Sequence, residues 1–258
     1  MLDVLETILG RLGAHMLAWR SQGLTQGRWE GAQLKAWADE HAHAFLLAEL
    51  GQAFPGIPVL SEEDESLHGI DRPDEYWLID PIDGTASFCG GFDGFVTQAA
   101  LMRHSAPAVA GVHAPALGLM YTAQLGGLAK CNGRVLATLE GTCKPVLIDN
   151  YPEPRGVAKR LYDELPCRGY IESGSLGLKI CRVADRTAGL FVKDVIVKDW
   201  DLAPGQLVLE CAGGVLTDFN GTPVDYQDGF ERFGVVASAD TGLARRVDTW
   251  RRSCASRQ

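Results

Sequence analysis

Apolar side chains recur every three or four positions at the start of the chain, as in an amphipathic helix. In residues 2–19 this repeat consists of Leu2, Leu5, Leu9, Leu12, Met16 and Trp19. The polar, glycine-containing stretch 21–27 predicts a loop. A second helix is predicted at about 30–52, with a stripe made of Leu34, Trp37, His41, Phe45, Ala48 and Gln52. The chain is therefore expected to begin with two helices.

The periodicity changes to two between residues 94 and 140, which is typical of strands. The apolar runs are separated by Pro, Gly and polar residues, and they lie at 94–102, 109–113, 117–123 and 126–131. Asn132-Gly133 follows the last run, and this dipeptide favours a two-residue hairpin turn. These runs predict an antiparallel meander.

After Gly141 the pattern alternates between strands and helices, which indicates α/β units. The strands are expected at 145–148, 168–171, 189–192, 215–218, 222–226 and 235–238, and the helices at 154–165, 174–185 and about 240–252. A further helix is expected to open at Trp200-Asp201-Leu202-Ala203 and to end at Gly213-Gly214, with Pro204 tolerated in its first turn. We predict an antiparallel N-terminal half, 1–141, a mixed α/β C-terminal half, 142–258, and an active cleft between them.

The composition indicates a globular protein, with 46% hydrophobic and 22% charged residues. A net charge of −9 and a pI near 5.1 argue against nucleic acid as a partner. The seven cysteines form an odd set without a Cys-x-x-Cys pair, which favours reduced thiols. The acidic N-terminus lacks the basic start of a signal peptide, and no apolar run is long enough to cross a membrane. We therefore expect a cytoplasmic protein.

Oxygen ligands for a metal ion are concentrated in Asp80-Pro81-Ile82-Asp83-Gly84-Thr85, which follows the apolar run 76–79. Mg²⁺ binds carboxylate and carbonyl oxygens, and Asp80, Asp83 and the Ile82 carbonyl could supply them together. If a helix begins after Asp83, the amides of Gly84 and Thr85 can donate to a phosphate oxygen. The same residue types are also common in ordinary turns.

Three further acidic positions have ordinary interpretations when each is taken alone. The run Ser61-Glu62-Glu63-Asp64-Glu65 could be solvated surface charge. Asp201 could be a plain helix cap, and Asp39 a solvated acid on a helix. The pattern of residues leaves these alternatives open.

Taken together, the motifs resemble the inositol monophosphatase superfamily of Mg²⁺-dependent, lithium-sensitive phosphatases. The resemblance extends from about residue 34 to about residue 240, and the motifs follow the family's order: Ser61-Glu62-Glu63, then Trp77 to Phe88, then Trp200 to Ala203 with Ala212-Gly213-Gly214. It implies a layered αβαβα sandwich of the sugar-phosphatase type and a homodimer. It also implies that a metal-activated water hydrolyses a small-molecule phosphate monoester.

The resemblance also implies roles for individual residues. Two or three Mg²⁺ ions, with Mn²⁺ able to substitute, would be held by Glu62, Asp80, the Ile82 carbonyl, Asp83 and Asp201. The attacking water would be activated by Thr85, Asp39 and Glu62. The substrate would be bound by Gly84, Thr85, Ser175, Asp194 and Asp201. Residues 21–38 depart from the family's pattern, which leaves the third metal ion and closure of this loop open.

The substrate is predicted to be an inositol or sugar monophosphate, because Asp194 and Ser173-Gly174-Ser175 resemble that branch. The alternatives are 3′-phosphoadenosine-5′-phosphate, which Pro223-Val224-Asp225-Tyr226 favours, and histidinol phosphate, which Phe88-Cys89-Gly90 favours. A non-catalytic binding homologue is a further alternative.

Overall fold

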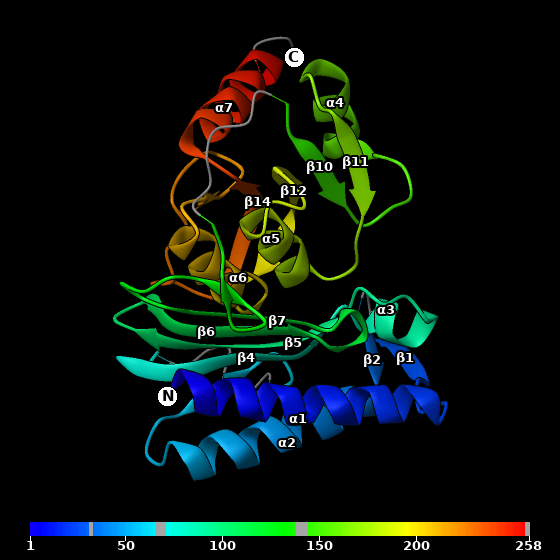
Figure 1. The fold of residues 1–258 in the computed structure, drawn as a ribbon, viewed down its shortest axis with the longest axis vertical. Helices are drawn as coiled ribbons and strands as arrows, with labels where there is room; N and C mark the ends of the chain where they lie inside the picture. Colours follow the sequence, from blue (N-terminus) through cyan, green and yellow to red (C-terminus); the bar gives the residue numbers. More distant parts are fainter. Residues whose placement is uncertain (31–32, 65–70, 138–143, 256–258) are drawn as a thin grey trace.

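The computed structural model describes residues 1–30, 33–64, 71–137 and 144–255, and these form five layers (Figure 1). Two helices cover the outer face of a seven-stranded sheet, and two more helices separate that sheet from a five-stranded one. A last pair of helices covers the outer face of the second sheet. The predicted αβαβα sandwich is therefore confirmed.

The outer layer of the N-terminal half consists of α1 (Leu2–Ser21) and α2 (Trp37–Ala53). The predicted stripe of α1 is confirmed, because Leu5, Leu9, Leu12 and Met16 are fully buried. The predicted start of the second helix is wrong, because β1 (Gly27–Glu30) and β2 (Gln33–Ala36) form an antiparallel hairpin before Trp37.

The buried face of α2 also differs from the predicted stripe. The core-facing residues are Ala38, Ala42, Leu46 and Leu50, whereas Trp37 is 41% exposed. The start of the helix is set by Asp39, whose Oδ2 accepts a hydrogen bond from the backbone N–H of Ala36 (2.6 Å). A carboxylate at this position caps a helix, so α2 begins at Trp37.

The first sheet contains a meander, as predicted. Its strands lie in the order β3 (Val59–Ser61), β4 (Glu75–Asp83), β5 (Val96–Arg103), β6 (Ala106–Ala114), β7 (Leu119–Gln124), β8 (Lys130–Cys131) and β9 (Arg134–Val135). Only β3 and β4 are parallel among these pairs. Short helices α3 (Thr85–Gly90) and η2 (Pro115–Leu117) connect strands. The expected hairpin turn is found at Asn132 and Gly133, which both have positive φ.

The second sheet has the order β11-β10-β12-β14-β13. Its strands are β10 (Val146–Asp149), β11 (Gly169–Glu172), β12 (Leu190–Lys198), β13 (Val215–Thr217) and β14 (Glu231–Ser238). Strand β10 is parallel to β11 and β12, while β14 is antiparallel to β12 and β13, so the mixed sheet is confirmed. The predicted strand 222–226 is wrong, because within this segment only Pro223 forms a bridge, with Thr217.

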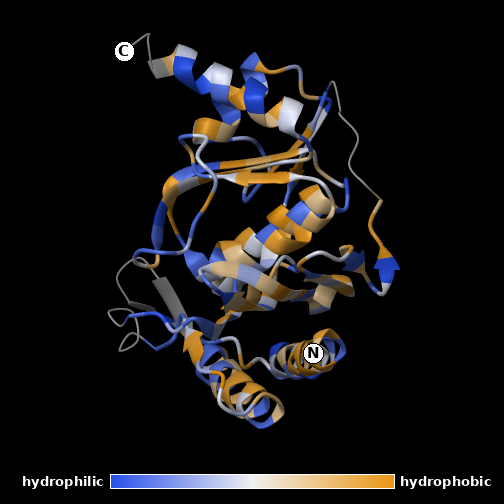
Figure 2. Ribbon diagram, turned by 90° about the vertical axis from the view of Figure 1, so that its left-hand side faces the viewer, coloured by the Kyte–Doolittle hydropathy of each residue, from blue (hydrophilic) through white to orange (hydrophobic). Residues whose placement is uncertain are grey.

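The remaining helices are α4 (Gly156–Glu164), α5 (Leu176–Ala184), α6 (Asp199–Cys211) and α7 (Thr241–Ala255). Helices α5 and α6 share an apolar core with both sheets, and α4 and α7 pack on the far side of the second sheet. Figure 2 shows the hydrophobic residues gathered on these inner layers. No helix in the described part of the chain is long and apolar enough to cross a membrane.

The proposed boundary between residues 141 and 142 falls within 138–143, outside the described residues. The division into two halves therefore stays a prediction.

Candidate active site

Three carboxylates meet where the first sheet faces the central helices. Oxygens of Asp80, Asp83 and Asp201 all lie within 4.8 Å of one another. Residues three apart on a regular strand point to opposite faces. Here the register with β5 shifts between Asp80 and Asp83, which places an extra residue on β4. Pro81, which has no N–H, fits this bulge, and the bulge turns both carboxylates to one side.

The start of α5 holds Asp83 in place. The backbone N–H groups of Gly177 (2.7 Å) and Leu176 (3.2 Å) donate to its carboxylate. Ser175 caps the same helix by accepting from the N–H of Leu178 (3.0 Å), and its own N–H donates to the Gly94 carbonyl (2.6 Å). A helix N-terminus favours negative charge, so α5 orients and stabilises the Asp83 carboxylate.

Asp201 lies in the first turn of α6 and also caps it. Its Oδ2 accepts from the backbone N–H of Lys198 (2.8 Å). Asp201 can therefore cap the helix and bind a metal ion at the same time, because a carboxylate has several acceptor sites. The start of α6 is fixed further by Arg72, which donates to Asp199 Oδ2 (2.7 Å) and lies 4.1 Å from the centre of the Phe230 ring.

Burial and mutual repulsion disfavour the ionised forms of this cluster. Burial, together with Glu62 and Asp83, raises the pKa of Asp80 well above its usual value. Burial and Asp83 raise the pKa of Asp201 to about 7, and burial and Asp201 raise the pKa of Glu62 to about 8. Such a cluster stays ionised at neutral pH only when cations lie among the carboxylates.

A second observation, on Asp80, also indicates that these residues suit a hard divalent cation. Asp80 Oδ1 is buried and has no hydrogen-bond partner among the described residues. A buried carboxylate oxygen without a donor is costly, and a metal ion would supply the missing interaction. Glu62, in the turn after β3, interacts with Asp80 through a side-chain hydrogen bond that lowers the Glu62 pKa.

The predicted water-activating pair is brought together. Thr85 Oγ1 donates to Asp39 Oδ1 (3.2 Å), and it also lies 3.2 Å from the Ile82 carbonyl oxygen. Helix α3 begins at Thr85, as expected, and Gly84 precedes it with φ +90°. A left-handed backbone at this point requires glycine, and a Cβ there would lie 3.3 Å from the Cβ of Ser175. These residues therefore line the same side of the carboxylate cluster.

Asp194 lies apart from this group of contacts. It is on β12, on the face that α4 covers, where its carboxylate is 3.6 Å from the Arg160 guanidinium. The preceding residue, Lys193, has the opposite orientation and pairs with Asp149 (2.6 Å). The structure thus brings Lys193 to the inner face of the sheet, and the substrate role of Asp194 stays a prediction.

Sequence reasoning missed two buried polar residues beside the cluster. Gln98 Nε2 donates to Asp83 Oδ2 (3.2 Å) and to the Trp200 carbonyl (3.0 Å). Lys179 donates to Asn150 Oδ1 and to the Gly174 carbonyl, and burial lowers its pKa to about 8 against the opposing effect of Asp83. The only signal in the sequence was a polar residue inside an otherwise apolar run.

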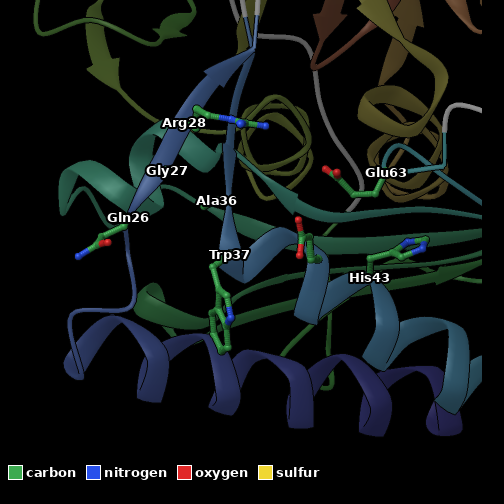
Figure 3. A pocket seen from close by; sticks show the side chains of 8 residues that line it. Gln26, Gly27, Arg28, Ala36, Trp37, His43 and Glu63 are labelled. Carbon is green, nitrogen blue, oxygen red and sulfur yellow. The ribbon is translucent and has the colours of Figure 1, made fainter.

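A cavity of about 620 Å³ lies at the start of α2 (Figure 3). Its walls come from β1, the start of α2 and the turn after β3, with Arg28 on one wall and Glu63 on another. Glu40 and Glu63, which line the cavity, directly follow Asp39 and Glu62 in the chain. The cavity is therefore lined by the same two segments that carry Asp39 and Glu62.

Comparison with known proteins gives a consistent result. The model of the "Inositol monophosphatase family" matches residues 19–251. The 3′(2′),5′-bisphosphate nucleotidase CysQ of Shigella flexneri is 33% identical over 194 residues, which cover 73% of this chain and 78% of that protein. The Nus factor SuhB of Vibrio cholerae is 29% identical over 217 residues, or 80% of this chain and 78% of that protein. The Thermotoga maritima IMPase structure has a TM-score of 0.83 at 22% identity, covers 98% of both chains and shares the fold.

Proposed function

This chain belongs to the inositol monophosphatase family, and from that premise we propose that it is a Mg²⁺-dependent phosphatase for a small-molecule phosphate monoester. One observation supports this most strongly. Asp80, Asp83 and Asp201 meet in one buried cluster, in which Asp80 Oδ1 has no hydrogen-bond partner within the described residues. Oxygen ligands in this arrangement suit Mg²⁺ or Mn²⁺ better than Zn²⁺ or Cu²⁺, which favour nitrogen and sulfur ligands.

The metal ligands are proposed in two sets that share one carboxylate. Glu62, Asp80 and the Ile82 carbonyl would hold one ion, and Asp80, Asp83 and Asp201 the other. The chemistry that bound Mg²⁺ supplies is neutralisation of the phosphoryl oxygens and a lower pKa for water. A third ion and inhibition by lithium are further expectations from the family.

The protein's own residues position the attacking water and the phosphate. Thr85 Oγ1 donates a hydrogen bond to Asp39 Oδ1 (3.2 Å), so a lone pair of the hydroxyl oxygen could accept a hydrogen bond from the attacking water and orient it. The amides at the start of α3, from Gly84 and Thr85, would donate to the phosphate oxygens. Their placement fixes the phosphate on the side of the cluster where Thr85 lies.

The substrate could belong to either of two classes, the polyol or sugar monophosphates and the bisphosphate nucleotides. A polyol or sugar monophosphate would use Ser175 and Asp194 to bind hydroxyl groups, although the Asp194 carboxylate is already paired with Arg160. A bisphosphate nucleotide could use positively charged side chains near the carboxyl ends of β10 and β11, where Asp149 and Glu172 are the acidic residues. Lys193 pairs with Asp149, and its ammonium and the Arg155 guanidinium lie 5.4 Å and 4.6 Å from the centre of the same Tyr151 ring.

A second phosphate on the leaving group would interact favourably with this positive charge, since phosphate binds lysine and arginine strongly. The relatives named as bisphosphate nucleotidases support the same choice. We therefore propose a 3′-phosphoadenosine-5′-phosphate-like substrate as the first to test, and inositol or sugar monophosphates as the second.

The experiment is a phosphate-release assay with 3′-phosphoadenosine-5′-phosphate, inositol monophosphate, sugar monophosphates and histidinol phosphate. Each substrate is measured with Mg²⁺, with Mn²⁺ and with EDTA. The proposal predicts release from at least one substrate that requires the metal ion. Full activity in EDTA would contradict the metal-dependent mechanism. No release from any substrate would favour a non-catalytic binding homologue.

A further inference from the structure

Gln98 is a fully buried amide, and its neighbours on the same face of β5 are apolar. It lies on β5 directly opposite Asp80 of β4, and the two residues face the same side of the sheet. Its neighbours on that face, Val96, Ala100 and Met102, pack into the core between the sheet and helices α5 and α6. A leucine or methionine would fill this position without the cost of burying a polar group.

The amide connects two elements that carry the metal-ligating carboxylates. Its Nε2 donates to Asp83 Oδ2 (3.2 Å), at the end of β4, and to the Trp200 carbonyl (3.0 Å), in the first turn of α6. Trp200 directly precedes Asp201. The Oε1 atom has no hydrogen-bond partner within the described residues. If the oxygen and nitrogen of the amide were exchanged, Oε1 would face the Asp83 carboxylate and the Trp200 carbonyl, which are both acceptors. Gln98 is therefore placed to act as a donor.

The Trp200 carbonyl does not receive the usual helical hydrogen bond from position 204. In an α-helix the carbonyl of residue i accepts from the N–H of residue i+4. Pro204 has no N–H, and it is the sixth residue of α6, beyond the first turn that the sequence predicted for it. Gln98 therefore supplies the donor that Pro204 removes.

Gly177 shows how closely this contact is packed. A Cβ atom at Gly177 would lie 2.0 Å from Gln98 Oε1, a distance that two heavy atoms cannot adopt. The N–H of Gly177 meanwhile donates to Asp83 (2.7 Å). Strand β5, the start of α5 and the start of α6 thus all meet at the Gln98 amide and the Asp83 carboxylate.

We propose that Gln98 is a positioning residue that sets the separation of Asp83 and Asp201, by donating to the Asp83 carboxylate and to the Trp200 carbonyl. This inference rests on the proposed function, because it assumes that these two carboxylates bind a divalent cation. A partner that orients a metal ligand without touching the metal typically changes metal affinity ten- to a hundredfold. Gln98 adds such a partner from the neighbouring strand.

The test compares Gln98→Met, the double variant Gln98→Met/Pro204→Ala and a control, Thr97→Val. Thr97 is the buried neighbour on β5, and its Oγ1 has no hydrogen-bond partner within the described residues. Two quantities are measured: the Kd for Mn²⁺, from the electron paramagnetic resonance signal of the free ion, and Tm in EDTA. Gln98→Met should weaken Mn²⁺ binding about ten- to a hundredfold and lower Tm. Thr97→Val should leave the Kd unchanged.

The double variant distinguishes an effect on the position of the metal ligands from an effect on the stability of the fold. It restores an N–H at position 204 for the Trp200 carbonyl, so Tm should recover relative to Gln98→Met. The Kd for Mn²⁺ should stay weak, because the hydrogen bond from position 98 to the Asp83 carboxylate is still missing. Recovery of the Kd together with Tm, or an unchanged Kd in Gln98→Met, would overturn the proposal. If the single variant does not fold, the double variant still carries the comparison with wild type.

Failure of the proposed function would look different. A wild-type protein that binds Mn²⁺ but releases no phosphate would refute the enzymatic assignment and leave the Gln98 test intact. A wild-type protein that binds no Mn²⁺ would overturn both.

Discussion

Removal of divalent cations should make the protein less stable as the pH rises. The pKa of Asp201 is raised from 3.8 to about 7, and that of Glu62 from 4.5 to about 8. At a pH between the unfolded and the folded pKa of each group, the carboxyl group is ionised in the unfolded chain and protonated in the folded protein. The unfolded state then binds fewer protons, so the free energy of unfolding falls with pH. The contribution of each group to the free energy of unfolding is therefore complete below the pKa of the unfolded chain. It is lost as the pH rises through the pKa of the folded protein.

The magnitude follows from the size of the shift. For Asp201 the pKa rises by about three units, and one unit corresponds to about 1.36 kcal/mol. Roughly 4 kcal/mol should therefore be lost between about pH 4 and about pH 7 from this carboxylate alone. A domain typically has about 5–15 kcal/mol of stability, so the loss is readily measurable.

The assay is urea unfolding over this pH range, followed by tryptophan fluorescence, since Trp77 and Trp200 are buried. Samples in EDTA should show the decline, and saturating MgCl₂ should remove it by binding the ionised carboxylates. Asp201→Asn should flatten the EDTA profile. The matched control, Asp163→Asn, changes an exposed acid of α4 and should leave the slope unchanged. Stability in EDTA that stays constant or rises between about pH 4 and about pH 7 would refute the reasoning.

Four further predictions concern catalysis. Asp83→Asn should lower turnover by orders of magnitude at saturating Mg²⁺ because one anionic ligand is lost; a rate near wild type would remove Asp83 from the metal site. If Thr85 and Asp39 act as one unit, Thr85→Ala/Asp39→Asn should be little slower than the slower single variant, and rate losses that multiply would show independent roles. If hydroxyl groups bind Asp194, Asp194→Ala should reduce kcat/KM for inositol monophosphate by about ten- to a hundredfold, or roughly 1.5–3 kcal/mol, and spare p-nitrophenyl phosphate. If a bisphosphate nucleotide is the substrate, Lys193→Met should instead lower kcat/KM selectively for 3′-phosphoadenosine-5′-phosphate.

The carboxylate cluster could be predicted because its members lie in short motifs with strong local signals. Asp80 and Asp83 flank Pro81, and the missing N–H of that proline favours the bulge that turns both side chains to one face. The contacts of Gln98 are of another kind. It reaches Asp83 across one strand and Trp200 more than one hundred positions away, and no periodicity encodes such pairs.

Two local errors have local causes. The second helix was predicted too early because Leu34 and Trp37 continue a helical repeat, although the Asp39 carboxylate caps the chain at Ala36. Pro204 was expected in a first helical turn because α6 was expected to open at Trp200. The Asp201 carboxylate instead accepts from the backbone N–H of Lys198 and caps the helix there, so α6 begins at Asp199. In both cases a side-chain hydrogen bond, rather than the hydrophobic pattern, decided where the helix begins.

The most direct test of the central claim is the anomalous diffraction of a crystal grown with Mn²⁺. The account predicts strong anomalous peaks among the carboxylates of Asp80, Asp83 and Asp201, with Glu62 and the Ile82 carbonyl as further ligands. Peaks that vanish in Asp83→Asn crystals would support the assignment of that ligand. Well-ordered crystals with no peak at this cluster, or with Mn²⁺ bound only elsewhere, would contradict it.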